Sequence, residues 1–137
     1  MKDRSNTEQK HHDKIVQGIA KIRFPYPDKE HPNWKTYENH PERKMGVKHK
    51  DNVSYPDIVV LNTETDRIFM SGEIEPESSV TAQAAQQWGE YSILCDLYLY
   101  VPKGYGNEAK KLSKNPNIKG FREYEVNRNG ELIVTNC

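Results

Sequence analysis

The sequence predicts an α/β domain in which helices flank a mixed β-sheet. Short apolar runs at 58–61, 67–75 and 96–101 are rich in β-branched and aromatic residues and have the length of buried strands. Helix-period patterns at 8–23 and 78–94 are interleaved with these runs. Such interleaving is typical of a sheet with helices packed on its faces.

The first predicted helix, Glu8 to Arg23, has a narrow apolar stripe formed by Ile15, Ile19 and Ile22. It ends before Pro25 and Pro27, because proline lacks the N–H that a helix needs and biases the preceding residue toward extended backbone. Residues 28–54 are mainly polar, and we expect a long loop with at most a short strand near 44–50.

The next two apolar runs predict a β-hairpin, since Asn62 to Asp66 between them have the composition of a tight turn. If residues 64–66 form a three-residue loop, Asp57 comes to lie opposite Glu73. A loop one residue longer would place Asp57 opposite Gly72 instead.

A second helix is predicted from a cap at Ser78 or Ser79 to about Leu94. Its core-facing stripe steps by three or four residues: Val80, Ala84, Trp88, Tyr91 and Cys95. The strand that follows, 96–101, is expected to pair in parallel with the strand of Glu73 through a right-handed crossover.

The rest of the chain predicts a basic helical segment from Asn107 to Lys114 and a last hairpin made of Gly120–Val126 and Glu131–Thr135. A chain of 137 residues has room for one domain with one core of modest size. We therefore expect a single domain over residues 1–137, in which residues 1–7 form a flexible tail.

The composition argues against several classes of protein. Hydrophobic residues make up 34% of the chain and charged residues 29%, and no apolar run approaches the roughly 18 residues of a membrane span. The N-terminus lacks the apolar segment of a secretory signal, and the two cysteines, Cys95 and Cys137, make neither a disulfide framework nor a zinc site. We therefore expect a cytoplasmic protein.

The net charge of zero hides a segregation of charge along the chain. The stretch from Asp57 to Glu77 has six acidic residues and one basic residue. Basic residues dominate the segments on either side of it: Arg43, Lys44, Lys48 and Lys50 before it, and Lys103, Lys110, Lys111, Lys114, Lys119 and Arg122 after it. This order suits an enzyme that holds a metal ion and acts on a polyanion; solvated surface charges are the alternative interpretation.

Three carboxylates in the acidic stretch indicate a metal site. In the register above, Asp57, Glu73 and Glu75 share one face of the hairpin while Ile74 points into the core. Two like charges about 4 Å apart repel by roughly 4 kcal/mol near a protein surface, and a divalent ion relieves this repulsion. Carboxylates with a main-chain carbonyl and waters form the octahedron that magnesium prefers. The alternative is that these carboxylates form the solvated face of an amphipathic strand.

These residues form a pattern that resembles the PD-(D/E)xK nuclease superfamily. Pro56-Asp57 stands where the family has PD, and Glu73-Ile74-Glu75 follows a hairpin in the place of (D/E)xK. The next helix carries Gln87 and Tyr91, similar to the QxxxY motif of the RecB-type branch. The resemblance covers about residues 55–101, and the rest of the chain only by the order of its elements.

The resemblance implies a restriction-endonuclease-like mixed sheet flanked by helices, and a nuclease, endo- or exonucleolytic, that hydrolyses phosphodiester bonds of nucleic acid with Mg²⁺ or Mn²⁺. We expect its substrate to be DNA. The implied catalytic residues are Asp57, Glu73 and Glu75, with the ion held by Asp57, Glu73 and the carbonyl of Ile74. The expected substrate-binding residues are Gln87, Tyr91, Lys103, Lys110 and Lys111. His12 in the first helix is a further candidate for the metal site, with an exposed tail histidine as the alternative.

The chain departs from the family at one position, because the family's lysine is Glu75 here. Some restriction enzymes of this fold are similar, and Glu75 would then orient or deprotonate the attacking water. The replacement also fits a catalytically inactive module that binds nucleic acid, as a homodimer or with a partner subunit. A third interpretation is a protein-interaction domain whose acidic hairpin docks on a basic partner without a metal.

Overall fold

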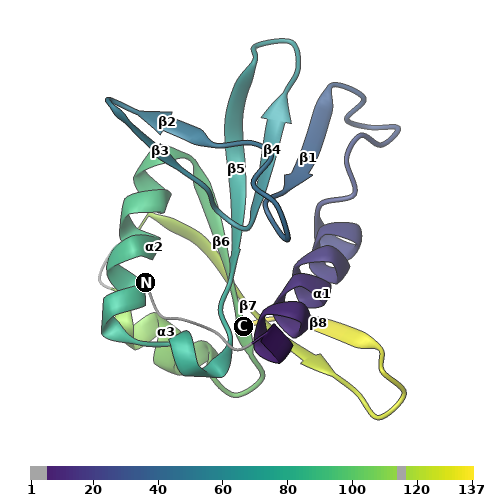
Figure 1. Ribbon diagram of the computed structural model, residues 1–137, viewed down its shortest axis with the longest axis vertical. Coiled ribbons are helices and arrows are strands. Elements are labelled where there is room, and N and C mark those ends of the chain that lie inside the picture. Colours follow the sequence, from purple (N-terminus) through teal and green to yellow (C-terminus); the bar gives the residue numbers. More distant parts are fainter. Residues whose placement is uncertain (1–5, 114–116) are drawn as a thin grey trace.

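The computed structural model describes residues 6–113 and 117–137. Six strands form one sheet in the order β1-β4-β5-β6-β7-β8: β1 (Trp34–Glu38), β4 (Ile58–Asn62), β5 (Arg67–Ile74), β6 (Asp96–Pro102), β7 (Ile118–Val126) and β8 (Leu132–Asn136). The neighbours β5, β6 and β7 are parallel, and the other neighbours are antiparallel (Figure 1). This mixed sheet confirms the predicted α/β class.

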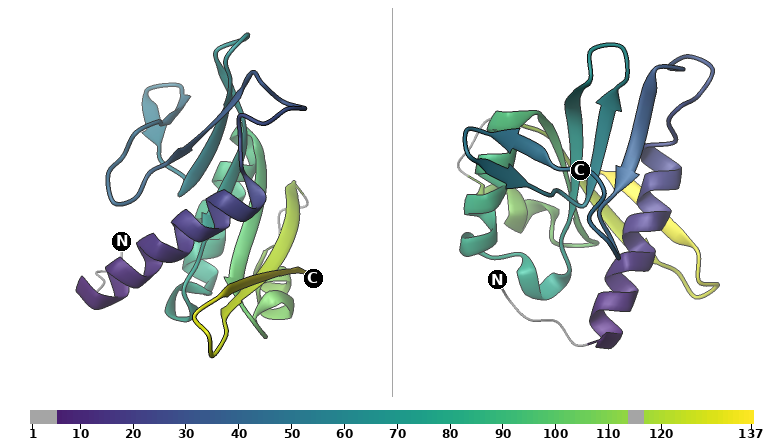
Figure 2. Two further views of the ribbon diagram at one scale, coloured as in Figure 1. Left: turned by 90° about the vertical axis from the view of Figure 1, so that its right-hand side faces the viewer. Right: turned by 45° about the horizontal axis from the view of Figure 1, so that its top comes forward.

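Helices cover both faces of the sheet (Figures 1 and 2). α1 (Asn6–Arg23) packs on β1, β5 and β8, whereas α2 (Ala82–Leu94) and α3 (Gly106–Leu112) pack on β6 and β7. Side chains of β6 alternate between the two cores, since Tyr100 is buried on the α1 side and Leu97 and Leu99 on the α2 side. The sheet is therefore the middle of three layers.

The buried stripe of α1 differs from the expected one. Ile15 and Ile19 are buried as predicted, but Ile22 is 48% exposed. Val16 and Ala20 are buried as well, so the buried face is displaced to one side of the predicted stripe and Ile22 falls at its rim. Because α1 begins at Asn6, residues 6 and 7 are helical rather than part of a tail, and residues 1–5 lie outside the described residues.

Residues 28–54 contain more structure than predicted. β1 pairs with β4 along its full length, and β2 (Val47–His49) with β3 (Asn52–Ser54) forms a two-stranded hairpin apart from the main sheet (Figure 2). The sequence does not predict β1, because β1 is a polar edge strand that pairs with one neighbour only. Such strands show little alternation of hydrophobic and polar residues.

The hairpin of β4 and β5 combines a longer turn with a β-bulge. Asn62 pairs with Arg67, so the turn has one residue more than predicted. Phe69 is an extra residue on β5 and forms a bulge, which restores the register that the turn displaced. Ile58 consequently pairs with Gly72, and the next residues, Asp57 and Glu73, come level as expected.

α2 begins later than predicted. Its N-cap is Thr81, whose Oγ1 accepts a hydrogen bond from the N–H of Ala84 at 3.2 Å. The expected caps, Ser78 and Ser79, lie in the 3-10 turn η1 (Glu77–Ser79). Trp88 and Tyr91 of the predicted stripe are buried.

The last elements agree with the prediction. The parallel pairing of β5 with β6 and the hairpin of β7 with β8 are confirmed. α3 covers most of the expected basic segment, whose last residue, Lys114, lies outside the described residues. Within the described chain, no helix has the length and apolar character needed to cross a membrane.

Candidate active site

Two carboxylates meet at the end of the sheet where β4 begins and β5 ends. The backbone N–H of Asp57 donates to Glu73 Oε1 at 2.9 Å, and the N–H of Ile74 donates to Asp57 Oδ2 at 2.8 Å. Asp57 and Glu73 are each only 6% exposed. The two side chains are therefore fixed by main-chain groups of the neighbouring strand.

Glu75 is held from two sides. Trp88 Nε1 on α2 donates to Glu75 Oε2 at 3.2 Å, and the Tyr124 hydroxyl donates to the main-chain oxygen of Glu75 at 2.8 Å. Glu75 is buried, and Ile74 between the two glutamates belongs to the core on the α1 side. The alternation predicted for this strand is therefore present.

Two histidines flank Asp57. His12 Nε2 lies 2.8 Å from the carbonyl oxygen of Ile74 and 3.5 Å from Asp57 Oδ2. His40 Nε2 lies 2.5 Å from Asp57 Oδ1, and the two imidazoles meet edge to face. His12 is 4% exposed, so it belongs to the site rather than to an exposed tail.

Asn39 positions the loop that carries His40. Its Nδ2 donates to the carbonyl oxygens of Pro56 at 2.7 Å and Met45 at 2.9 Å, and its Oδ1 accepts from the N–H groups of Lys44 and Met45. The backbone N–H of Asn39 also donates to the carbonyl oxygen of Asp57 at 2.9 Å. Buried Asn39 thus ties this loop to the chain that enters the site.

The electrostatics of the site follow from burial and proximity. Burial raises the pKa of Glu73 well above its usual value of 4.5, and the charges of Asp57 and Glu75 raise it further. Burial would also raise the pKa of Asp57, but hydrogen bonds from His12 and His40, and their charges, hold it below the usual 3.8. Without a cation, Glu73 is the carboxyl group that favours its protonated form.

Tyr91 lies within the field of the same carboxylates. Burial raises its pKa above the usual value of 10.0, and the charges of Glu73, Asp57 and Glu75 add to the effect. Gln87, one turn earlier on α2, is exposed. The structure therefore brings Tyr91 close to the predicted site and leaves Gln87 on the helix surface.

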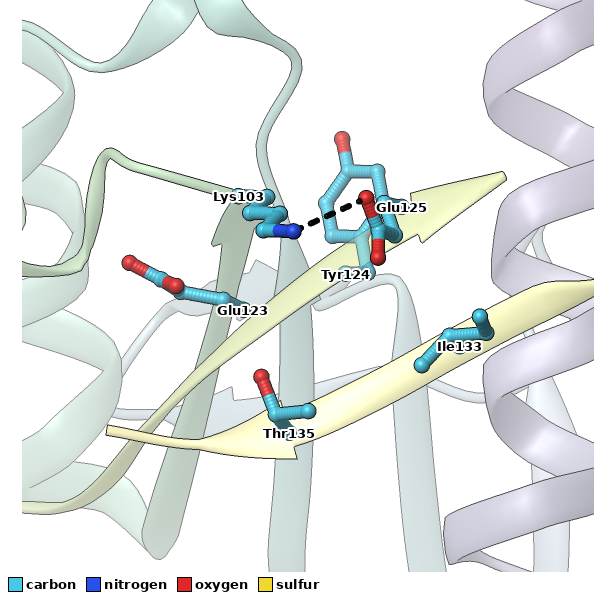
Figure 3. A pocket seen from close by; sticks show the side chains of 6 residues that line it. All are labelled: Lys103, Glu123, Tyr124, Glu125, Ile133 and Thr135. Carbon is cyan, nitrogen blue, oxygen red and sulfur yellow. Dashed lines mark ion pairs between the residues drawn. The ribbon is translucent and has the colours of Figure 1, made fainter. Parts of the chain in front are cut away.

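The three lysines that we expected to contact substrate have contacts with other parts of the protein or with solvent. Lys103 pairs with Glu125 at 3.5 Å beside a small hollow of about 80 Å³ between β7 and β8, and both side chains are substantially exposed (Figure 3). Lys110 on α3 lies over the ring of Phe121, and Lys111 is exposed. These contacts place the three lysines against β7 or in solvent.

Sequence reasoning missed three residues of the site. His40 lies 17 residues before Asp57 in a polar loop, and no local pattern marks it as buried or paired. Asn39 gives no signal either, since its partners are main-chain groups that only the fold brings together. The sequence predicts Trp88 as a core residue. A buried indole N–H needs a hydrogen-bond acceptor, and this requirement was the available signal that Trp88 also contacts a polar group.

The donor set fits a divalent cation. His12, His40 and Asp57 each offer a ligand atom, and these three atoms lie within 4.8 Å of one another. His12 Nδ1 is buried and has no hydrogen-bond partner among the described residues, which is uncommon for a buried nitrogen. Glu73 adds a buried carboxyl group whose ionisation a cation would favour.

Comparison of the chain with models of protein families, with curated proteins and with solved structures finds no match. The interpretation of the site consequently depends on its own geometry and chemistry.

Proposed function

We propose that the protein is a divalent-metal-dependent nuclease that hydrolyses phosphodiester bonds of nucleic acid, with DNA as the expected substrate. The observation that carries the proposal is the burial of Asp57, Glu73 and Glu75 at one end of the sheet beside two imidazoles. Clustered buried carboxylates are unfavourable unless a proton or a cation compensates their charge. Mg²⁺ or Mn²⁺ would provide that compensation and a catalytic function.

Asp57, Glu73, His12 and the carbonyl of Ile74 are the groups that would hold the ion. The carbonyl already lies 2.8 Å from His12 Nε2, but a carbonyl oxygen has a second lone pair for a ligand. An ion held by these groups would supply Lewis acidity toward the phosphate and toward a water molecule. Glu75, held by Trp88, orients or deprotonates the attacking water.

The basic segment between His40 and Asp57 supplies phosphate contacts. Arg43, Lys44, Lys48 and Lys50 are all exposed on this segment, which includes the β2–β3 hairpin. His40 and Asp57 at its two ends are in contact through their side chains. The ends of this segment therefore lie beside the carboxylates, and the lysines and arginine along it would neutralise bound phosphates.

One observation favours a second function, a module that binds nucleic acid without cleaving it. Glu75 replaces the lysine that the resemblance implies, and Trp88 Nε1 donates to its carboxylate, as in a structural contact. In such a module the basic segment would still bind phosphates, and the carboxylates would have no catalytic role.

A cleavage assay separates the two functions. Purified protein is incubated with labelled single-stranded, duplex and branched DNA and with RNA, in Mn²⁺, in Mg²⁺ and in EDTA, with Glu73→Ala as control. Metal-dependent cleavage that the variant lacks supports the nuclease. Gel retention of a nucleic acid without cleavage in either metal supports the binding module and contradicts the nuclease.

A further inference from the structure

We infer that His40 is a direct ligand of the metal ion together with His12 and Asp57, and that the site takes Mn²⁺ or a similar first-row transition-metal ion in preference to Mg²⁺. The inference deepens the proposed function, because it assigns the ligands and the identity of the ion. It concerns a residue outside the strand motif that the resemblance covers.

One nitrogen atom of each imidazole lies close to a carboxylate oxygen of Asp57. His40 Nε2 lies 2.5 Å from Asp57 Oδ1, and His12 Nε2 lies 3.5 Å from Asp57 Oδ2. Ligand atoms around one ion with bonds of about 2.1 Å are separated by roughly 3 Å. A movement of roughly half an ångström at His40 would bring its nitrogen and Asp57 to that separation.

His40 is also supported at the nitrogen that faces away from Asp57. His40 Nδ1 lies 3.4 Å from the Asp13 carboxylate, which in turn accepts a hydrogen bond from Gln9 Nε2 at 2.8 Å. Gln9 Nε2 also lies 3.4 Å from His40 Nδ1. In the metal-free protein Nε2 donates to Asp57; when a metal ion displaces that proton, the carboxylate of Asp13 favours a proton on Nδ1 and the lone pair of Nε2 binds the ion. Histidines that bind metals commonly have such a carboxylate or carbonyl behind the ring.

His12 is held by a main-chain group at the nitrogen nearest Asp57. Its Nε2 donates to the carbonyl oxygen of Ile74, so the unshared electron pair remains on Nδ1. Nδ1 is buried without a hydrogen-bond partner in the described part of the chain. Because Nε2 is the nitrogen that lies 3.5 Å from Asp57, binding of the ion at Nε2 requires His12 to carry its proton on Nδ1 instead.

The types of ligand atom determine which ion the site prefers. Mg²⁺ prefers oxygen ligands and retains its waters, whereas imidazole nitrogen suits first-row transition metals. A site made only of carboxylates would not discriminate strongly between Mg²⁺ and Mn²⁺, because oxygen ligands suit both ions. Two imidazoles beside Asp57 therefore shift the preference toward Mn²⁺ and its neighbours in the series.

The test measures metal binding and coordinated nitrogen, independently of cleavage. Mn²⁺ is titrated into metal-free protein and followed by electron paramagnetic resonance, with Mg²⁺ as competitor. Electron spin-echo modulation of the bound Mn²⁺ then counts the imidazole nitrogens coordinated to it. The variant is His40→Gln, which retains a hydrogen-bond donor toward Asp57 but has no imidazole. The matched control is His11→Gln, on the exposed face of α1.

We expect Mn²⁺ to bind at least roughly tenfold more tightly than Mg²⁺, with modulation from two imidazoles. In His40→Gln one imidazole coupling disappears and the Mn²⁺ affinity falls roughly tenfold or more, while His11→Gln behaves as wild type. Should His40→Gln fail to fold, the number of nitrogens in the wild-type spectrum decides the question by itself.

Two results would overturn the inference. Bound Mn²⁺ with one imidazole or none, or with modulation unchanged in His40→Gln, means that His40 only hydrogen-bonds Asp57; the nuclease proposal survives this result. Absence of saturable binding of both Mn²⁺ and Mg²⁺ contradicts the proposed function as well.

Discussion

The N–H of Asp57 and the carboxylate of Glu73 are joined by a 2.9 Å hydrogen bond across two antiparallel strands. The pair is level because the bulge at Phe69 compensates for a turn that is one residue too long. A register error of one residue would oppose Asp57 to Gly72 and turn every side chain of the strand to the other face. The bulge at Phe69 is therefore needed to bring Asp57 and Glu73 level with each other.

The first prediction is that Glu73→Gln stabilises the metal-free protein at neutral pH. Glutamine is nearly isosteric and always neutral, so folding no longer requires residue 73 to bury a charge or to take up a proton beside Asp57 and Glu75. We expect a higher melting temperature in EDTA for this variant than for wild type. Glu131→Gln, on an exposed loop, is the control and should leave the melting temperature unchanged. A lower melting temperature for Glu73→Gln would contradict the assignment of repulsion to this site.

The second prediction is the pH dependence of the same effect. The folded-state pKa of Glu73 is raised above 4.5, so its stabilising contribution is complete below 4.5 and is lost as the pH rises through the folded pKa. The pKa of Asp57 is lowered, so its contribution is present above 3.8 and is lost as the pH falls toward the folded value. Thermal melts in EDTA should show the advantage of Glu73→Gln shrinking from about pH 8 to pH 5. An advantage independent of pH would contradict this.

The third prediction concerns Trp88→Phe. The variant loses the hydrogen bond from Nε1 to Glu75 Oε2 and leaves a buried carboxylate with one donor fewer. We expect a loss of about 2–4 kcal/mol in the free energy of unfolding, measured by urea denaturation. Trp34→Phe, at a half-buried tryptophan of the edge strand β1, is the matched control and should cost less. Equal losses in the two variants would count against a special role of the indole N–H.

The fourth prediction concerns Asn39→Ala. Four side-chain hydrogen bonds of a buried residue disappear, so we expect a loss of about 2–4 kcal/mol in urea denaturation. The loop that carries His40 should also loosen and the affinity for Mn²⁺ should fall. Asn52→Ala, at an exposed asparagine of β3, should lie within about 0.5 kcal/mol of wild type. An Mn²⁺ affinity unchanged by Asn39→Ala would show that the loop does not position the ion.

The elements with a strong hydrophobic period could be predicted from the sequence. β4, β6 and the second half of β5 are largely buried, and the stripe of α2 is anchored by Trp88. The alternation of Glu73, Ile74 and Glu75 also followed from the sequence, because side chains in a strand alternate strictly.

The remaining features depend on contacts between distant residues. The polar strand β1 is stabilised by pairing with β4, and the sequence of β1 contains no signal for this pairing. Thr81 is the N-cap of α2 because Ser78 and Ser79 belong to the 3-10 turn η1 before it. His40 reaches Asp57 only because Asn39 and the chain around Pro56 fix the intervening loop. Such pairings depend on tertiary structure, and local propensity gives no information about them.

The most direct test of the central claim is the rate of Mn²⁺-dependent cleavage of labelled nucleic acid by three proteins: wild type, Glu73→Gln and Glu131→Gln. We predict cleavage by wild type and Glu131→Gln that EDTA abolishes, and a rate reduced roughly a hundredfold or more in Glu73→Gln, which should remain folded. Full activity in folded Glu73→Gln would contradict the account.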